Sequence, residues 1–276
     1  MNDSFLRFHL NILKKIFSNP EFELRALLNA SSITKQQILL NNFDINKINY
    51  DKFKNFFHRR LLHEPISKIS NNKEFWSLNF FVNQFVLDPR PESEFLIQTI
   101  RELFPDINKI LKICDLGTGS GCLAVTIASI YKNSIIEATE ISKEAIKVAK
   151  KNAYIHKVQN RIKFINCDWI KKNNKFDIVV SNPPYLSLNQ YESCASNIKN
   201  FEPKIALLSG RDGLDSYRKI ARISNSILHN ASYLFLEIGQ SQKDDIIKIF
   251  DKINLKTIKI IKDYQIIDRV LVLKKY

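Results

Sequence analysis

Four consecutive residues, Asn182-Pro183-Pro184-Tyr185, could together bind a planar amino group. The two prolines lack backbone N–H donors and hold the chain extended, which leaves the carbonyls of Asn182 and Pro183 without local partners. With the side-chain oxygen of Asn182, these carbonyls form a rigid set of acceptors for the two hydrogens of an –NH2 group, and the ring of Tyr185 could stack on its plane. A plain proline turn after a strand is the alternative. The residue types favour a binding site.

A glycine-rich loop further upstream indicates a cofactor-binding turn. Three glycines let the backbone turn sharply and approach a ligand closely before a helix N-terminus. The spacing is G-x-G-x-G, not the G-x-G-x-x-G of dinucleotide-binding proteins, and Asp115 directly precedes the loop. A carboxylate there would repel a pyrophosphate but suits a cationic ligand, such as a sulfonium or an ammonium group. The cofactor-binding candidates in this loop are Asp115, Gly117, Thr118, Gly119, Ser120 and Gly121.

Three further residues predict an adenosine group in the ligand. Glu140 ends the next predicted strand, where a carboxylate can accept hydrogen bonds from both ribose hydroxyls. Its alternative role is a charge in the first turn of a helix. Asp168 could accept from an adenine amine and Trp169 could lie on the adenine face. Either would more often be a turn or packing residue, but the preceding motifs favour adenine contact.

The elements that must position these residues alternate between short apolar runs and amphipathic segments. This alternation predicts βαβ units and a mostly parallel sheet covered on both faces, with ligands bound at the carboxyl ends of the strands. The predicted strands are Ile110–Cys114, Ser134–Thr139, Ile162–Asn166, Phe176–Val180, Ser232–Glu237, Leu255–Ile261 and Arg269–Leu273. The predicted helices are Leu123–Tyr131, Lys143–Ile155, Leu214–Leu228 and Asp244–Ile253.

The first 69 or so residues have a different periodicity and predict a small bundle of three to five helices. One apolar stripe consists of Phe53, Phe56, Phe57 and Leu61, with Asn46 as the expected N-cap of that helix. The stretch 74–88 is rich in aromatic and β-branched residues and predicts a β-hairpin or extended pair. A new helix is expected to begin near Ser93, after two prolines.

The composition is that of an ordinary globular protein, with 276 residues, 45% of them hydrophobic and 25% charged. No run approaches the roughly 18 consecutive apolar residues of a membrane helix, and residues 1–15 do not resemble a secretory signal. The four cysteines are scattered, with no C-x-x-C pair. We therefore expect a cytoplasmic protein with reduced thiols, no membrane association and no metal site.

The formal net charge of +14 could mark a surface that faces nucleic acid. The basic residues are dispersed, however, and a chain that uses lysine heavily throughout would have the same charge. The net charge alone therefore does not indicate whether the protein binds nucleic acid.

Taken together, these motifs resemble those of S-adenosylmethionine-dependent amino-methyltransferases, which modify planar nitrogens of adenine, guanine or glutamine. The narrower resemblance is to the bacterial release-factor glutamine methyltransferases. It rests further on Arg59-Arg60, His63–Ile66, Glu74–Leu78, Pro89–Glu92 with Glu94, Phe201–Pro203, Gly210 with Gly213-Leu214, Glu237–Gly239 and Asp263–Arg269. Two positions depart from the family: Glu140 stands where aspartate is frequent, and Asp88 where an apolar residue is common.

The resemblance implies a Rossmann-like class I fold of the α/β type, with a mostly parallel seven-stranded sheet and a small N-terminal helical bundle. It implies a helical substrate-docking domain over residues 1–70, a hairpin linker over 71–90 and an S-adenosylmethionine-dependent domain over 91–276. The implied reaction is methyl transfer to the N5 atom of the glutamine in the Gly-Gly-Gln motif of class 1 release factors, by a monomer with no stable nucleic-acid partner. Asn182, Pro183 and Tyr185 would be catalytic, and Pro184 would complete the substrate site.

Three alternatives remain. One is methylation of an exocyclic amine in nucleic acid, which needs a basic groove and stacking platform. Another is methylation of a glutamine in a ribosomal protein by a sister family with the same core. The third is a binding protein without turnover, against which the intact Asn182–Tyr185 run argues.

Overall fold

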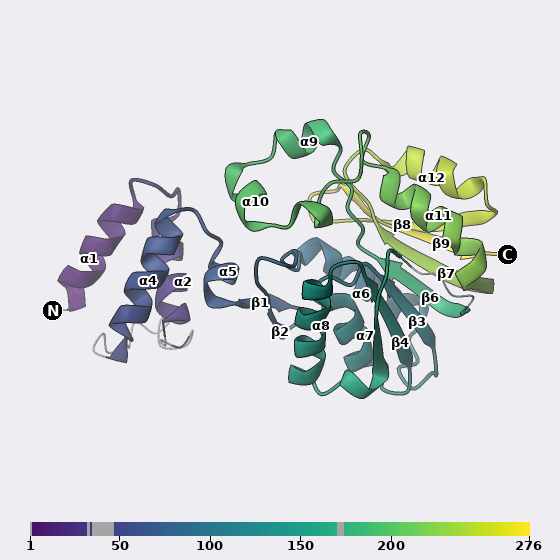
Figure 1. Cartoon of the computed structure of the whole chain (residues 1–276), viewed down its shortest axis with the longest axis horizontal. Coiled ribbons are helices and arrows are strands. Elements are labelled where there is room, and N and C mark those ends of the chain that lie inside the picture. Colours follow the sequence, from purple (N-terminus) through teal and green to yellow (C-terminus); the bar gives the residue numbers. More distant parts are fainter. Residues whose placement is uncertain (1, 32–33, 35–46, 170–173) are drawn as a thin grey trace. The chain divides into compact units, whose positions relative to one another are not determined.

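The computed structural model describes residues 2–31, 34, 47–169 and 174–276. The chain divides into two compact units, Met1–Asn72 and Lys73–Tyr276 (Figure 1). Within the described residues, no helix is both long and apolar enough to cross a membrane.

The first unit is a set of short helices around a small apolar core. Its described helices are α1 (Asn2–Leu13), α2 (Pro20–Ala30), α4 (Tyr50–Leu61) and α5 (Ile66–Ser70). The core includes Leu13, Leu27, Phe53 and Phe57, so the stripe predicted on α4 does face inward. The predicted cap Asn46 lies outside the described residues, and the prediction was wrong because α4 begins later: the side chain of Asn49 accepts from the Lys52 N–H.

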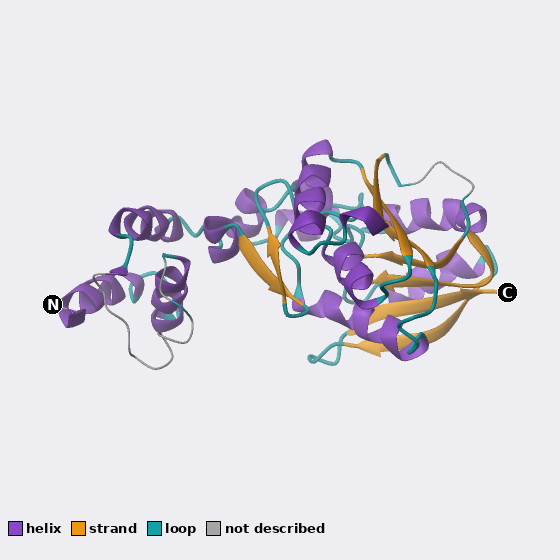
Figure 2. Ribbon diagram, turned by 90° about the horizontal axis from the view of Figure 1, so that it is seen from below, coloured by secondary structure: helices purple, strands orange, loops and turns teal. Residues whose placement is uncertain are grey.

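The predicted hairpin is shorter than expected. It consists of β1 (Asn72–Phe75) and β2 (Leu78–Phe81), which form a two-stranded sheet separate from the large one (Figure 2). Trp76 and Ser77 both have positive φ, as a tight two-residue hairpin turn requires. Beyond Phe81 the apolar residues Val82 and Val86 are buried against helix α8 (Lys143–Ile155) without forming a strand. Their burial explains why the apolar pattern of residues 82–88 resembled a strand.

The second unit contains a seven-stranded sheet in the order β5-β4-β3-β6-β7-β9-β8. Every neighbouring pair from β5 to β7 is parallel, and β9 is antiparallel to both of its neighbours, so the predicted mostly parallel sheet is confirmed. The predicted strands differ from the observed ones only at their ends. The observed bounds are β3 Lys112–Leu116, β4 Ile135–Glu140, β5 Ile162–Asn166, β6 Phe176–Ser181, β7 Leu228–Glu237, β8 Leu255–Lys262 and β9 Asp268–Lys275.

Helices cover both faces of this sheet (Figure 1). One face packs against α6 (Glu94–Leu103), α7 (Cys122–Ile130) and α8 (Lys143–Ile155), and the other against α11 (Asp215–Ile227) and α12 (Lys243–Asp251). Two short helices that were not predicted, α9 (Leu188–Glu192) and α10 (Ser196–Phe201), follow the proline run. Alternate residues of β3 point to opposite faces, with Ile113 in one core and Cys114 in the other.

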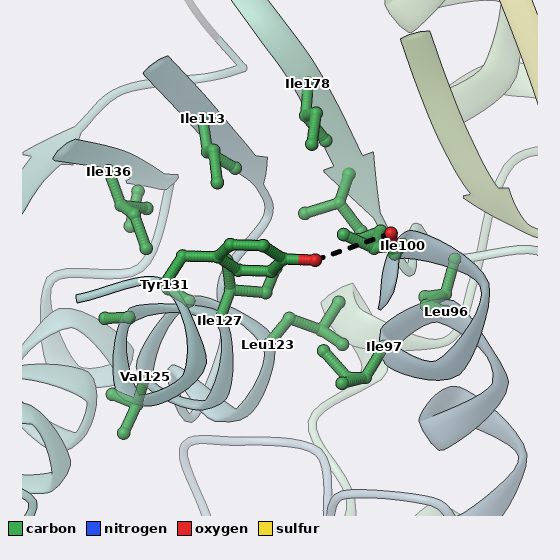
Figure 3. Close-up of a cluster of buried hydrophobic side chains, with 14 of the residues drawn as sticks. Leu96, Ile97, Ile100, Ile113, Leu123, Val125, Ile127, Tyr131, Ile136 and Ile178 are labelled. Atoms are coloured by element: carbon green, nitrogen blue, oxygen red, sulfur yellow. Dashed lines mark hydrogen bonds between the residues drawn. The ribbon is translucent and has the colours of Figure 1, made fainter. Parts of the chain in front are cut away.

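The core under α6 and α7 contains one buried tyrosine, Tyr131 (Figure 3). Its hydroxyl donates to the Phe104 carbonyl at 2.7 Å, and this hydrogen bond satisfies a polar atom that would be costly to bury alone. The bond ties the C-terminal end of α7 to that of α6, next to the segments that lead into β4 and β3.

The edge strand β8 carries lysines at 256, 259 and 262. Ion pairs join two of them to neighbouring elements, Lys256 to Asp251 and Lys259 to Glu102. Charged side chains along an edge strand hinder pairing with another sheet.

Candidate active site

The predicted cofactor residues meet at the carboxyl ends of β3, β4, β5 and β6. Most of them line one cavity of about 330 Å³, which is also bounded by the side chain of Asn182. The lining includes Gly117, Thr118, Gly119, Ser120, Glu140, Asp168, Trp169, Asn182 and Pro184. Asp115 and Gly121 do not line it, and they lie beneath the loop as buried residues.

The glycine loop has the backbone that the spacing predicts. Gly117, Gly119 and Gly121 all have positive φ, between 53° and 82°, where glycine alone is unstrained. The N–H groups of Gly117 and Thr118 both donate to the Thr139 carbonyl at 2.9 Å, so the loop is fastened to the end of β4. At Gly121 a Cβ would lie 3.1 Å from that of Ala149, so glycine also permits close packing of α7 on α8.

Glu140 holds the loop from the neighbouring strand. One carboxylate oxygen accepts from the Gly119 N–H at 3.0 Å, and the other accepts from the Ser142 N–H at 2.9 Å, next to the cap of α8. Each carboxylate oxygen can accept more than one hydrogen bond. Glu140 therefore has the structural role considered above, a carboxylate at the start of a helix. Its oxygens can still accept hydrogen bonds from a ligand in the cavity.

Asp115 is buried, and burial raises the pKa of its carboxyl to about 7. One oxygen accepts from the Thr118 hydroxyl at 2.6 Å and from the Ala124 N–H at 3.2 Å. Among the described residues, the other oxygen, Oδ1, is buried and has no hydrogen-bond partner. An unsatisfied buried carboxylate oxygen beneath a ligand loop is suited to stabilise a positive charge above it.

Asp168 and Trp169 lie side by side at the cavity wall. The carboxylate of Asp168 pairs with Lys219 of α11 at 3.3 Å. Trp169 has a positive φ of 60°, a strained backbone for a bulky residue, and its ring faces the glycine loop. Strained residues of this kind are found at ligand sites when the surrounding structure holds them in place.

Asn152 of α8 is a supporting residue that the sequence did not indicate. Its side-chain amide donates to the Ser120 carbonyl at 2.8 Å and to the Phe81 carbonyl at 2.9 Å, and its oxygen accepts from the Phe81 N–H. It thus joins the glycine loop to the hairpin. No local pattern distinguishes such a residue from a helix surface asparagine.

A second cavity, of about 340 Å³, lies on the other side of Asn182. Its lining includes Arg90, Glu92, Tyr185, Glu237 and Arg269. Asn182 lines both cavities, whereas Pro183 is buried and lines neither. Burial raises the pKa of Tyr185 to about 12, so its hydroxyl stays protonated at neutral pH.

Two ion pairs border this second cavity, and all of their members except the half-exposed Arg90 are largely buried. Arg90 pairs with Glu202 at 3.0 Å, and Arg269 pairs with Asp263 at 2.9 Å and donates to the Ile238 carbonyl at 3.2 Å. These pairs involve the Pro-Arg-Pro-Glu, Phe-Glu-Pro and Asp263–Arg269 segments. They fasten segments that, with Tyr185, line this cavity.

Gly213 allows the chain to pass close to Tyr185. A Cβ on Gly213 would lie 2.5 Å from the Tyr185 carbonyl oxygen and 2.6 Å from Gln242 Nε2, and the φ of Gly213 is +81°.

Gly213→Ala should lower the free energy of unfolding by roughly 2–4 kcal/mol, because left-handed backbone strain and overpacking add together. Gly119→Ala, with φ +53° and open space around its Cβ, is the matched variant and should cost only about 1–2 kcal/mol. Denaturant unfolding without ligand measures both, and equal losses would contradict the steric argument.

The residues around the first cavity fit S-adenosylmethionine. A glycine loop allows close approach of the ligand, the carboxylate of Glu140 suits a ribose, and Trp169 offers a flat apolar surface. The buried free oxygen of Asp115 matches a cation. When bound there, this cofactor would supply a methyl group activated by a positively charged sulfur.

Comparison with known proteins agrees with the fold and the site. Residues 87–198 match the Methyltransferase small domain family. The structure resembles a crystal structure of a methyltransferase from Pyrococcus furiosus, with a TM-score of 0.54, 18% identity and coverage of 79% of this chain and 97% of that one. The fold and the site thus define a Rossmann-like class I methyltransferase.

Sequence relatives narrow this class. The chain is 36% identical to the release factor glutamine methyltransferase of Buchnera aphidicola subsp. Baizongia pistaciae, over 95% of both chains. It therefore belongs to the release factor glutamine methyltransferase family. It is also 37% identical to the bifunctional methyltransferase of Rickettsia typhi over 94% of this chain, but spans only 54% of that protein.

Proposed function

We propose that this protein transfers a methyl group from S-adenosylmethionine to the side-chain amide nitrogen of the glutamine in the Gly-Gly-Gln motif of class 1 release factors. The observation that carries the proposal is the position of Asn182. Its side chain lies between a cavity suited to the cofactor and a second cavity lined by Tyr185. The family names of relatives that match over nearly the whole chain support the same substrate.

The chemistry requires positioning more than activation by a strong base. An amide nitrogen is a poor nucleophile because its lone pair is delocalised into the carbonyl. The Asn182 oxygen would accept one amide hydrogen, and the protonated, half-buried Tyr185 would pack against the amide plane. The Pro183 carbonyl is the proposed second acceptor, although Pro183 itself is buried and lines neither cavity. Holding the nitrogen in line with the methyl carbon and excluding water would then supply most of the rate enhancement. As the N–CH3 bond forms, the bond between methyl and sulfur would break, S-adenosylhomocysteine would leave, and the methylated nitrogen would release one proton that ends in solvent.

The helical unit is proposed to dock the protein substrate, with a domain over residues 1–70, a hairpin linker over 71–90 and the methyltransferase domain over 91–276. Large apolar side chains are exposed on this unit, among them Phe8, Phe22 and Leu62. Exposed aromatic and leucine side chains are suited to contact a protein. Such apolar side chains do not bind phosphate groups, so these residues favour a protein over a nucleic acid as the partner.

We further propose that the protein acts as a monomer in the cytoplasm without a stable nucleic-acid or membrane partner. All four cysteines are free thiols, as is usual in a reducing compartment.

The test is methyl transfer from labelled S-adenosylmethionine to purified release factor. A release factor with its Gly-Gly-Gln glutamine replaced by alanine is the matched control, and ribosomal protein, total RNA and DNA are separate acceptors. Label in the intact release factor alone is the expected result. Equal label in both release factors, or label only in ribosomal protein or nucleic acid, would overturn the proposed substrate.

A further inference from the structure

Behind Asn182, three side chains from distant parts of the sequence form a chain of hydrogen bonds. The Asn182 amide Nδ2 donates to the Ser93 hydroxyl oxygen at 2.8 Å, and that hydroxyl donates to Glu237 Oε2 at 2.5 Å. Ser93 lies in the short 3-10 turn before α6, and Glu237 ends β7. Ser93 and Glu237 are 2% and 1% exposed, so water does not compete for these bonds.

The number of available hydrogens fixes the direction of this chain. A serine hydroxyl carries one hydrogen, and in this arrangement the carboxylate of Glu237 takes it. The Ser93 oxygen can then only accept, so Asn182 must turn its –NH2 end toward Ser93. The Asn182 oxygen must consequently face away, toward the cavities. If the amide were turned over, two oxygens would face each other without a hydrogen between them, which costs free energy in a buried site.

We propose that Ser93 and Glu237 are positioning residues that keep the Asn182 side chain turned with its oxygen toward the acceptor amide. Without them the Asn182 amide could present either end, and its –NH2 end would face the –NH2 group of the substrate. The inference builds on the proposed function, because it explains how the acceptor oxygen is presented. It adds two residues, Ser93 at the wall of the first cavity and Glu237 at the wall of the second, that act through Asn182.

The protonation state of Glu237 should therefore matter. Burial raises the pKa of its carboxyl to about 7, while the Ser93 hydrogen bond and the positive charge of Arg269 lower it. Arg90 and Glu92 also act on it, Tyr185 lies nearby, and Tyr217 donates to the Glu237 backbone carbonyl. Below that pKa, protonated Glu237 can donate to Ser93, which frees the Ser93 hydrogen to point at Asn182. The orientation of Asn182 is then lost, so kcat should fall as the pH drops through about 7.

Ser93→Ala tests the relay. Measured with saturating cofactor and release factor, this variant should lose about tenfold to a hundredfold in kcat and lose the acid limb of the kcat profile. Its calorimetric Kd for S-adenosylmethionine should stay within about twofold. Ser93→Thr, which keeps the hydroxyl, should recover most of kcat together with the acid limb. Ser224→Ala removes an equally buried hydroxyl that donates to the Ile220 carbonyl within α11, and should change none of these quantities.

A spectroscopic measurement decides the relay without any acceptor protein. With ¹⁵N-labelled asparagine, the Asn182 –NH2 signals, assigned by their loss in Asn182→Ala, should shift with pH near 7 in the wild type and not in Ser93→Ala. Unchanged kcat in Ser93→Ala, an acid limb that persists there, or Asn182 signals that titrate equally in both proteins would overturn the proposal. If the wild type leaves the release factor unlabelled, the proposed function fails, and these signals still decide the relay.

Discussion

Asn182→Ala should lower kcat for methyl transfer by about 30- to 1000-fold, which corresponds to about 2–4 kcal/mol. The substitution removes the side-chain acceptor at the meeting point of the two cavities. Because this hydrogen bond holds the amide in line in the transition state, kcat should fall rather than KM rise. Steady-state kinetics with release factor as the acceptor measure the change.

Two comparisons keep this result interpretable. Asn133→Ala removes a surface asparagine whose side chain donates to the Asn108 carbonyl, and it should leave kcat unchanged. The affinity of Asn182→Ala for S-adenosylmethionine should remain within a few fold of the wild type. Near-normal turnover in Asn182→Ala would refute the role assigned to this residue.

The second large effect concerns Asp115 and should appear in the pH dependence of cofactor binding. The pKa of its carboxyl is about 7 in the ligand-free protein because the group is buried. A cationic ligand favours the ionised form, so binding should release a proton, and the Kd for S-adenosylmethionine should fall about fivefold from pH 6 to pH 7. Asp115→Asn should bind more weakly at pH 7 and show no such dependence. A flat profile in the wild type would contradict this linkage.

Stability provides an independent measure of the same carboxyl. A raised folded-state pKa means that, between about pH 4 and pH 7, the folded protein keeps a proton that the unfolded chain has lost. The contribution of Asp115 to stability is therefore complete below pH 4 and is lost as the pH rises through 7. Asp115→Asn stays neutral, so without ligand it should melt at a higher temperature than the wild type at pH 8.

The same pH series of Kd measured with S-adenosylhomocysteine tells which cation Asp115 senses. This ligand lacks the sulfonium charge but keeps the ammonium group, so a pH dependence that disappears assigns the effect to the sulfonium.

The sheet and the cofactor loop could be predicted from the sequence because their signals are local. Buried parallel strands are short continuous apolar runs, and the ligand residues follow directly after them. The strand 162–166 and the helix 143–155 were predicted with the bounds that the structure has. Errors arose where burial occurs without regular structure, as with Val82 and Val86, whose pattern resembled a strand.

The supporting parts of the site could not be predicted in this way. Ser93 and Glu237 are 144 positions apart in the sequence. The sequence marks Ser93 only as a helix start and Glu237 only as part of a segment shared with the family, and neither pattern indicates that the two side chains bond. Asn152 lies 71 positions from Phe81, to which it bonds. Such contacts exist only after the strands have adopted their order in the sheet. Sequence patterns therefore identified the residues expected to touch ligands, whereas the residues that orient them appeared only in the structure.

The lysines along β8 contribute to the net charge and have a role that needs no ligand. In concentrated solution, and while new chains are folding, the exposed strand edges of two molecules can meet. Here each such encounter would bring the lysine side chains of two β8 edges together. Asp251 and Glu102 neutralise two of these lysines within the chain, but Lys262 and the long charged side chains themselves still obstruct strand pairing. This obstruction disfavours fibrillar stacking, so these lysines protect the edge strand against aggregation.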